Sequence, residues 1–234
     1  MNVNIGVCVS GQMRAIDSWD TFAPYLKSNS RSAKVFLHTW KQQETQRVFR
    51  FFDHKLGQFY PLVYSNQEAI KKIQPNQCLI EENTEDVVDV CRGIGPTDVT
   101  RHRVLSMWRG QYKACELATK HDTFDIMCRT RSDIVFETDP FVCLEHETIQ
   151  EGVVYIPEGP NGGDPECSPD IALHDWFGIA KPNTFVKFVS LYSKLQEYFR
   201  SNPTLFPEVM LKYHVDQMGL RIVRYPVKYF IKRV

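Results

Sequence analysis

The sequence predicts a single α/β domain with a mostly parallel central sheet and helices on both faces of that sheet. Three observations favour this fold class. Strand-like apolar runs alternate with amphipathic helical segments through the first half of the chain, which is the order of a parallel sheet. Within residues 124–136, residues 125–128 and 134–136 are of the kind that buried parallel strands need, and Arg129, Arg131 and Asp133 stand between them. The length of 234 residues suits one large domain, expected to span residues 1–234.

In the first third of the chain, short apolar runs predict strands, and apolar residues three or four positions apart predict helices. Ser65 and Glu68 have the spacing of a capping box, and Pro75 ends the helix that the box begins. The expected strands are residues 4–10, 33–39, 62–64 and 77–80. The expected helices are residues 14–27, 41–56 and 65–75, and a solvated acidic loop is expected over residues 81–89.

The clearest helix is expected over residues 100–120, and it leads directly into a strand over residues 125–128. Its buried stripe is expected to be Val104, Trp108, Gln111, Cys115 and Ala118. Further strands are expected at residues 134–136, 153–156, 176–180 and 220–223. Further helices are expected from a cap at Thr184 through Phe199 and over residues 207–218. Residues 157–169 are rich in proline and glycine and predict a long loop, which at that length indicates a functional role.

Composition excludes some classes of function. Lysine plus arginine equals aspartate plus glutamate at 28 each, so no overall charge favours nucleic acid as a partner. No apolar run approaches the length of about 18 residues that a membrane-spanning helix requires, and the N-terminus reads as a strand, not a signal peptide. Seven scattered cysteines without C-x-x-C spacing indicate reduced core residues, so a cytoplasmic location is expected.

Polar residues follow three of the expected strands. Ligands of parallel α/β sheets bind beyond the carboxyl ends of the strands, so these residues are expected to converge there. Glycine lets a backbone approach a ligand closely, and arginine contacts phosphate in a bidentate manner. Charges of both signs suit a substrate that carries phosphates and hydroxyls. The candidate nucleotide-binding residues are Ser10, Gly11, Gln12, Arg14, His38, Trp40, Arg129 and Arg131, with Asp133 beside them.

Several segments together resemble a known family. They are VSGQMR (residues 9–14), FLHTW (36–40), SMWRGQYKACE (106–116), CRTRSDIVF (128–136), DWFGIA (175–180) and FPE (206–208). In this order they resemble the small GT-A-type glycosyltransferases of large DNA viruses, bacteria and some eukaryotes. The resemblance implies a GT-A-like fold, a UDP- or GDP-sugar donor, and transfer of the sugar to a hydroxyl of a glycan or glycoprotein. It covers nearly the whole chain, either as a complete enzyme or as part of a longer multidomain transferase.

One position departs from the pattern that this resemblance implies. GT-A enzymes usually carry Asp-x-Asp after the central strand and bind a divalent metal there, whereas this chain has Arg131-Ser132-Asp133. Either Asp133 helps to hold Mn²⁺ or Mg²⁺, or Arg129 and Arg131 supply the positive charge themselves. A third interpretation is that residues 129, 131 and 133, which share one side of a strand, neutralise one another.

The expected catalytic residues are Asp133 and Asp175. Asp133 is expected to anchor the donor sugar or its metal, and Asp175 to deprotonate the acceptor hydroxyl if the enzyme inverts. Glu208 is the second candidate for the base, although a glutamate in a first helical turn also simply favours the helix dipole. An alternative function is a sugar- or nucleotide-binding module, or an inactive transferase-like domain. A sugar-nucleotidyltransferase ranks lower, because the first strand-to-helix turn has only one glycine.

Overall fold

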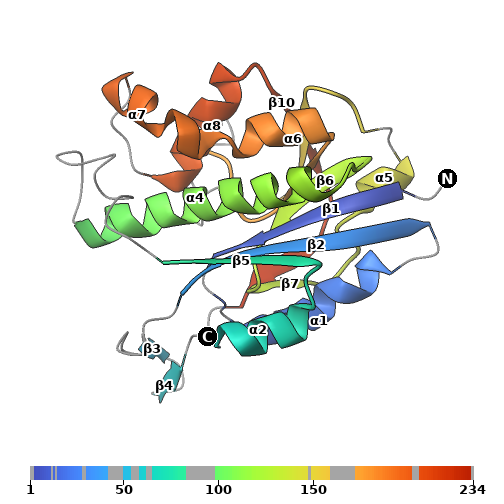
Figure 1. The fold of residues 1–234 in the computed structure, drawn as a ribbon. Coiled ribbons are helices and arrows are strands. Elements are labelled where there is room, and N and C mark those ends of the chain that lie inside the picture. Colours follow the sequence, from blue (N-terminus) through green and yellow to red (C-terminus); the bar gives the residue numbers. More distant parts are fainter. Residues whose placement is uncertain are drawn as a thin grey trace.

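A seven-stranded sheet forms the centre of the molecule, and helices cover both of its faces (Figure 1). The structure is a computed structural model. It describes residues 3–11, 13, 15–27, 30–41, 50–53, 58–61, 65–82, 98–146, 149–158, 172–201 and 206–232. The predicted α/β class with a mostly parallel sheet is therefore confirmed.

The strands of the central sheet lie in the order β10-β8-β9-β6-β1-β2-β5. Only β9 runs antiparallel to its neighbours, β6 and β8. The other pairs are parallel. The bounds are β1 Val3–Ser10, β2 Arg31–Trp40, β5 Gln77–Glu81, β6 Ile126–Thr130, β8 Val153–Pro157, β9 Gly178–Ala180 and β10 Arg221–Tyr225.

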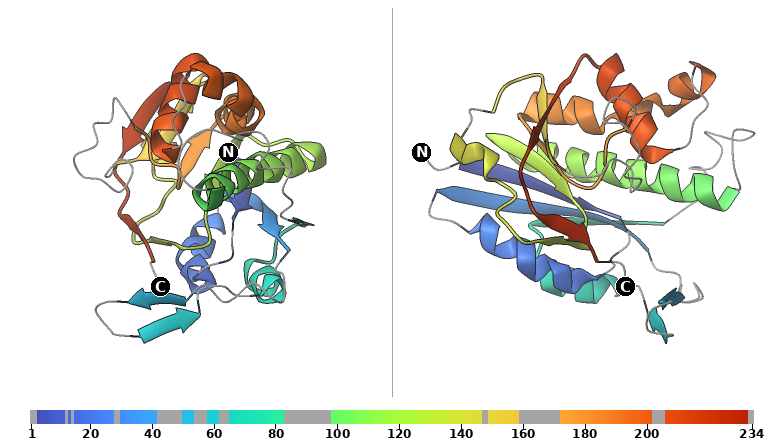
Figure 2. Two further views of the ribbon diagram at one scale, coloured as in Figure 1. Left: turned by 90° about the vertical axis from the view of Figure 1, so that its left-hand side faces the viewer. Right: turned by 180° about the vertical axis from the view of Figure 1, so that it is seen from behind.

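Four helices cover one face of the sheet: α4 (Asp98–His121), α6 (Pro182–Val189), α7 (Leu191–Ser201) and α8 (Pro207–Gln217). The opposite face carries α1 (Trp19–Phe22), the 3-10 turns η1 (Ile16–Ser18) and η2 (Ala23–Leu26), and α2 (Asn66–Ile73). Figure 2 shows the same two-sided covering in two further views. Each face has its own apolar core: Trp108 and Phe188 lie in the core beneath α4, whereas Phe22 and Phe177 lie in the other.

Two small antiparallel sheets and one short helix complete the described elements. Strand β7 (Ile134–Phe136) pairs with β11 (Tyr229–Ile231), and β3 (Arg50–Asp53) pairs with β4 (Gln58–Pro61). Helix α5 covers Cys143–His146. Strand β7 therefore does not continue the central sheet, and β11 was not predicted.

The register brings the polar strand ends together at one edge of the sheet. Ser10 lies opposite His38 across β1 and β2, and Val9 lies opposite Thr130 across β1 and β6. The predicted convergence of the first, second and sixth strands is confirmed. Strand β6 extends to Thr130, beyond the expected end at residue 128, so Arg129 lies inside the strand.

The prediction of one helix over residues 14–27 was wrong for its described part. The chain instead makes η1, α1 and η2 in succession, and each of these is only three or four residues long. Ala15 adopts a positive φ of 42° just before η1. Pro24 lacks the N–H that a continuing α-helix needs, so the helix tightens into a 3-10 turn at that point.

The predicted helix over residues 41–56 was also wrong where the structure describes it, because Arg50–Asp53 is the strand β3. The sequence RFFD satisfies both helical and strand patterns, and pairing with Gln58–Pro61 selects the strand. Residues 42–49 and 54–57 lie outside the described residues, as do the strand expected at 62–64 and the loop residues 83–89.

The long helix predicted from Thr184 to Phe199 is two helices. Helix α6 begins earlier, with Pro182 in its first turn, so Thr184 lies inside the helix and does not cap it. The Thr184 hydroxyl instead accepts a hydrogen bond from the Gly152 N–H at 2.7 Å. Ser190 separates α6 from α7, although the predicted apolar face is preserved: Phe185, Phe188 and Leu195 are buried.

Two predictions based on local signals are confirmed. Ser65 and Glu68 form a reciprocal capping box at the start of α2, which ends at Gln74 directly before Pro75. Helix α4 covers the expected residues 100–120, and Trp108, Gln111, Cys115 and Ala118 are buried as expected. No helix in the described part of the chain is long and apolar enough to cross a membrane.

Candidate functional site

The turn after β1 is held against the end of β2. Gly11 has a φ of 115°, which glycine adopts without a side-chain penalty. Its N–H donates to the His38 carbonyl at 3.3 Å, and its own carbonyl accepts from the Thr39 hydroxyl at 3.0 Å. Ser10 is buried beside this turn. The candidates Gln12 and Arg14 lie outside the described residues.

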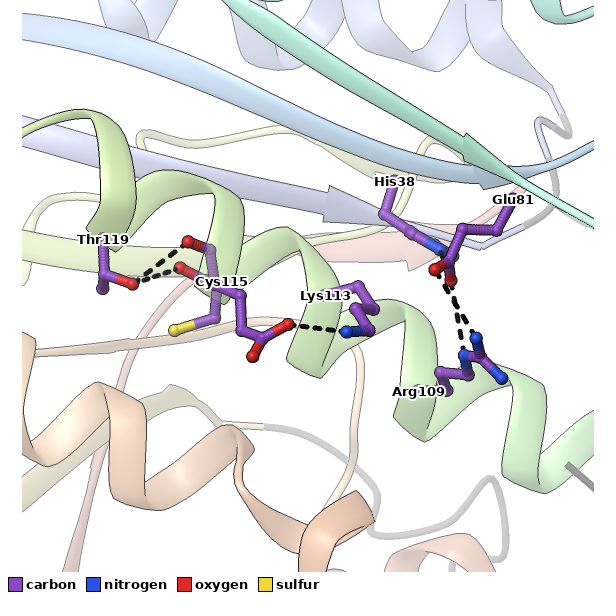
Figure 3. Close-up of polar contacts among 7 residues, drawn as sticks. His38, Glu81, Arg109, Lys113, Cys115 and Thr119 are labelled. Atoms are coloured by element: carbon purple, nitrogen blue, oxygen red, sulfur yellow. Dashed lines mark hydrogen bonds and ion pairs between the residues drawn. The ribbon is translucent and has the colours of Figure 1, made fainter.

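His38, Trp40, Glu81 and Arg109 form a cluster at the same edge, here called the His38 cluster. Figure 3 shows the contacts of Glu81 with His38 and Arg109. Nε2 of His38 lies 3.0 Å from Oε2 of Glu81, and Nε of Arg109 lies 3.3 Å from the same oxygen. The His38 and Trp40 rings meet edge to face at 4.8 Å, and the Arg109 guanidinium lies 5.8 Å from the centroid of the Trp40 ring. Burial lowers the pKa of His38 more than Glu81 raises it, so at neutral pH the neutral ring donates from Nε2 to Glu81.

The sequence did not reveal two members of the His38 cluster. Glu81 was assigned to a solvated loop, but it ends β5, and its side chain is only 21% exposed. No sequence pattern marks Arg109 as a site residue, because its partner Glu81 lies 28 residues away in the sequence. A periodicity argument detects only neighbours along one element, so this contact had no sequence signal. His38 and Trp40 are themselves buried, and their role in binding a nucleotide stays a prediction.

Arg129 is buried in the layer between the sheet and the helices. It is 2% exposed, and its guanidinium carbon lies 4.5 Å from the Phe188 ring centroid and 5.7 Å from that of Trp108. Its Nη1 donates to Oε1 of Gln111, whereas its Nε and Nη2 have no hydrogen-bond partner among the residues that the structure describes. Burial lowers the pKa of Arg129 to about 10, with nearby Asp175 acting in the opposite sense, so the group stays charged at neutral pH.

Arg131 and Asp133 form a bidentate ion pair directly after β6. Nε of Arg131 donates to Oδ1 of Asp133 at 2.9 Å, and Nη2 donates to Oδ2 at 2.6 Å. The Asp133 side chain is 7% exposed and that of Arg131 is 28% exposed. The charges of these two side chains therefore neutralise each other. This agrees with the third interpretation of the sequence, which places residues 131 and 133 on one side of the segment.

A divalent cation does not fit the donor groups that the described residues offer here. Both oxygens of Asp133 already accept hydrogen bonds from Arg131, and a guanidinium occupies the space beside them. Hard cations need several oxygen ligands, and no group of three or more histidine, cysteine, aspartate or glutamate residues in the described ranges could hold one. Asp133 as a metal ligand therefore has no support from its geometry.

Asp175 lies at the start of the segment that leads into β9, facing the two arginines. It is 3% exposed and interacts electrostatically with Arg129 and Arg131, and its Oδ2 has no hydrogen-bond partner in the described part of the chain. The neighbouring His174 ring is completely buried, and its Nε2–H donates to the Pro157 carbonyl at 2.9 Å. Burial lowers the pKa of His174 to about 4, so this ring is neutral at physiological pH.

Glu208 completes the group from the first turn of α8. Its backbone carbonyl accepts from the Leu173 N–H at 3.0 Å, which ties the start of α8 to the segment carrying Asp175. Burial raises the pKa of Glu208, and its own backbone N–H counteracts part of that shift. Asp175 raises this pKa further, while Arg131 lowers it.

The structure thus gathers Arg129, Arg131, Asp133, Asp175 and Glu208, here called the arginine–carboxylate cluster. Helix α4 links this cluster to the His38 cluster, because Gln111 contacts Arg129 while Arg109, two residues earlier, contacts Glu81. Residues from β1, β2, β5, β6, α4, α8 and the segment before β9 therefore surround one edge of the sheet. Such an arrangement offers cations for an anionic ligand and carboxylates for hydroxyl groups.

Comparison with solved structures finds distantly similar proteins. One similar solved structure is a point mutant of a Drosophila β-1,4-galactosyltransferase 7, in complex with manganese, UDP-Gal and xylobiose. The TM-score is 0.45 and the sequence identity is 9%, over 95% of this chain and 64% of that chain. This chain therefore spans less than two thirds of the length of that structure, and no residue role follows from the likeness. The sequence matches no protein-family model and no curated protein.

Proposed function

We propose that this protein is a glycosyltransferase that moves a sugar from a UDP- or GDP-sugar to a hydroxyl of a glycan or glycoprotein. The observation that carries the proposal is the arginine–carboxylate cluster at the carboxyl edge of a mostly parallel sheet. A nucleotide-sugar presents two negatively charged phosphates beside a ring of hydroxyls. Guanidinium groups are the natural partners of the phosphates, and carboxylates accept hydrogen bonds from the hydroxyls.

In this proposal Arg131 is the principal contact to the diphosphate. A guanidinium has five N–H donors, and Asp133 takes one from each of two nitrogens, so donors remain on a side chain that is 28% exposed. Asp133 orients the guanidinium and balances its charge while the site is empty of ligand. The positive charge of Arg131 then stabilises the negative charge that develops on the leaving diphosphate.

Arg129 and Asp175 are proposed to line the innermost part of the site. Both are almost fully buried, and both carry polar atoms that have no hydrogen-bond partner within the described ranges. Buried polar groups are usually satisfied, so such atoms at one place favour a ligand site over a purely structural arrangement. Ser10 and Gly11, at the end of β1, are proposed to lie along the nucleotide.

A sugar- or nucleotide-binding module without catalytic activity is the second candidate. The observation that favours it is the ion pair between Arg131 and Asp133, because that pair occupies the carboxylate on which a metal-dependent transferase would rely. Both candidates predict binding of a nucleotide-sugar, and only the first predicts turnover.

A thermal-shift screen against UDP-, GDP-, CMP- and dTDP-sugars, each with and without Mn²⁺, tests the proposal. A ligand at a hundred times its dissociation constant stabilises a two-state fold by about 2.7 kcal/mol, which gives a clear shift. We expect a shift with one class of nucleotide and little dependence on Mn²⁺. Release of the free nucleoside diphosphate from the same donor then separates a transferase from a binding module. No shift with any donor would contradict both.

A further inference from the structure

The three carboxylates of the cluster differ in their contacts and in their exposure. Asp133 is bound at both oxygens by Arg131. No salt bridge joins Asp175 or Glu208 to a residue in the described part of the chain, but Asp175 is only 3% exposed, whereas Glu208 is partly exposed. Because Asp133 is occupied by a guanidinium and Asp175 is closed off from solvent, Glu208 is the carboxylate that an acceptor hydroxyl can reach.

The position of Glu208 is rigid. Pro207 in the first turn of α8 restricts the backbone conformation at the helix start. The hydrogen bond from Leu173 N–H to the Glu208 carbonyl joins this turn to the segment before β9. Farther along α8, Nε2–H of His214 donates to the Lys187 carbonyl of α6 at 2.8 Å. A group held in this way can stand at a fixed distance from a bound acceptor.

We infer that Glu208 accepts the proton of the attacking acceptor hydroxyl, and that Asp175 is a positioning residue that supplies the counter-charge of Arg129 and Arg131. The inference rests on the proposed glycosyltransferase function and reassigns the base that the sequence placed at Asp175. The charged groups that act on Glu208 are Asp175, which strengthens it as a base, and Arg131, which weakens it. Burial adds to the effect of Asp175 and raises the pKa of Glu208.

The proposed step is a single displacement. The acceptor hydroxyl proton passes to a carboxylate oxygen of Glu208 while the acceptor oxygen bonds to the anomeric carbon of the donor sugar. The bond from that carbon to the diphosphate oxygen breaks, and its electron pair leaves on the diphosphate beside Arg131. Glu208 then releases the proton to solvent. Attack opposite the leaving group inverts the configuration at the anomeric carbon.

Three variants test this assignment: Glu208→Gln, Asp175→Asn and the control Asp216→Asn. Asp216 also lies on α8, but its side chain is 53% exposed and pairs with Lys212 of the same helix. The assay uses the nucleotide-sugar that shifts the melting temperature of the wild-type protein, with p-nitrophenyl glycosides as acceptors. Product formation, donor affinity and the anomeric configuration of the product are measured.

We expect Glu208→Gln to lower kcat by about 10²- to 10⁴-fold, the usual contribution of a general base, with donor affinity changed less than about twofold. The base must be ionised to accept a proton. A plot of wild-type kcat/KM against pH should therefore decline at low pH as one group titrates, and this decline should be absent in Glu208→Gln. Asp175→Asn should weaken donor binding and lower the melting temperature, and Asp216→Asn should match the wild type.

Near-normal turnover in Glu208→Gln, an acid limb unchanged in that variant, or a product of retained configuration would each overturn the assignment while leaving the transferase function intact. Absence of turnover in the wild-type protein with every donor would instead overturn the proposed function, and this inference with it.

Discussion

Arg131 occupies the position at which the resemblance to GT-A enzymes leads one to expect an aspartate, and its partner is the aspartate that remains. The two side chains form two hydrogen bonds of 2.9 and 2.6 Å. A guanidinium is a permanent, directional cation that needs no ligand sphere. One residue can therefore supply, within the chain, positive charge that a divalent ion would otherwise bring to a diphosphate.

Replacing Arg131 by alanine should weaken binding of the nucleotide-sugar by about 10- to 100-fold. Charge-assisted hydrogen bonds contribute about 1.5–3 kcal/mol each, and about 1.4 kcal/mol corresponds to a factor of ten. Arg131→Lys should recover part of the affinity, since it restores the charge but not the planar fork. Isothermal titration with the donor measures both effects.

The matched control is Arg221→Ala. Arg221 is an exposed arginine that donates to Gln150 at 2.9 Å, away from the cluster. Its removal should leave donor affinity unchanged. Equal affinity in the wild-type and Arg131→Ala proteins would show that this guanidinium does not contact the diphosphate.

At the scale of elements, α8 sets the position of Glu208, and His214 fastens α8 to two other helices. Nδ1 of His214 accepts from the Tyr198 hydroxyl of α7 at 2.9 Å, while Nε2–H donates to the Lys187 carbonyl of α6 at 2.8 Å. The ring is completely buried, and burial lowers its pKa to about 4. A neutral imidazole with one donor and one acceptor nitrogen satisfies both partners.

Substituting His214→Ala should lower the free energy of unfolding by about 2–5 kcal/mol. The change removes the His214 hydrogen bonds to the Tyr198 hydroxyl and to the Lys187 carbonyl, at about 0.5–1.5 kcal/mol each. It also leaves a cavity in place of a completely buried ring, and truncation of a large buried side chain costs about 2–5 kcal/mol. Urea denaturation followed by tryptophan fluorescence measures the loss. Lys212→Ala, which removes an exposed ion pair on the same helix, should change stability by less than about 0.5 kcal/mol. A loss of that small size for His214→Ala would contradict the anchoring role.

At the scale of the whole molecule, the central sheet separates two apolar cores, and the candidate site lies where helices from one side approach the strand ends. His214 lies on the side covered by α4, α6, α7 and α8, whereas the His174 ring lies beside Trp176 and Tyr229, which pack against the other core. Both rings are completely buried and neutral, so both link the stability of the fold to pH. The organisation of residues 1–234 as one domain stays a prediction.

The free energy of unfolding should fall as the pH is lowered from about 6.5 to about 4. Burial lowers the pKa of both histidines in the folded protein to about 4, below the ordinary value of about 6.5, so between these values the unfolded chain binds more protons. Each histidine contributes on the order of 3 kcal/mol to the free energy of unfolding. This contribution is present above pH 6.5 and is lost as the pH falls toward 4. Glu208, whose pKa is raised, acts weakly in the opposite sense.

Urea titrations at several pH values between 4 and 7.5 measure this dependence. In His214→Ala the slope of stability against pH in that window should be about half that of the wild-type protein. A wild-type stability that is constant from pH 7 to pH 4.5 would show that neither histidine is kept neutral by the fold.

The sequence by itself determined those features that depend on neighbours within about ten residues. The capping box at Ser65 and Glu68, the helix Asp98–His121 and the apolar strands are of this kind, because hydrophobic period and cap chemistry are local. The parallel order also followed from the alternation of elements, and with it the meeting of Ser10, His38 and residues 129–133 at one edge. Arg131, Asp133, Asp175 and Glu208 could therefore be identified as candidates in advance.

Only the tertiary structure decided how these residues divide their roles. It buried Arg129 between Phe188 and Trp108, joined Arg131 to Asp133, brought Glu81 to His38 and Arg109, and left Glu208 more exposed than Asp175. It also selected a strand at Arg50–Asp53 and broke the helix at Ser190. These outcomes depend on which elements pack together, and hence on burial and on the distances between charges. Burial and charge separation determine which carboxylate can accept a proton, and neither is a property of a local segment of sequence.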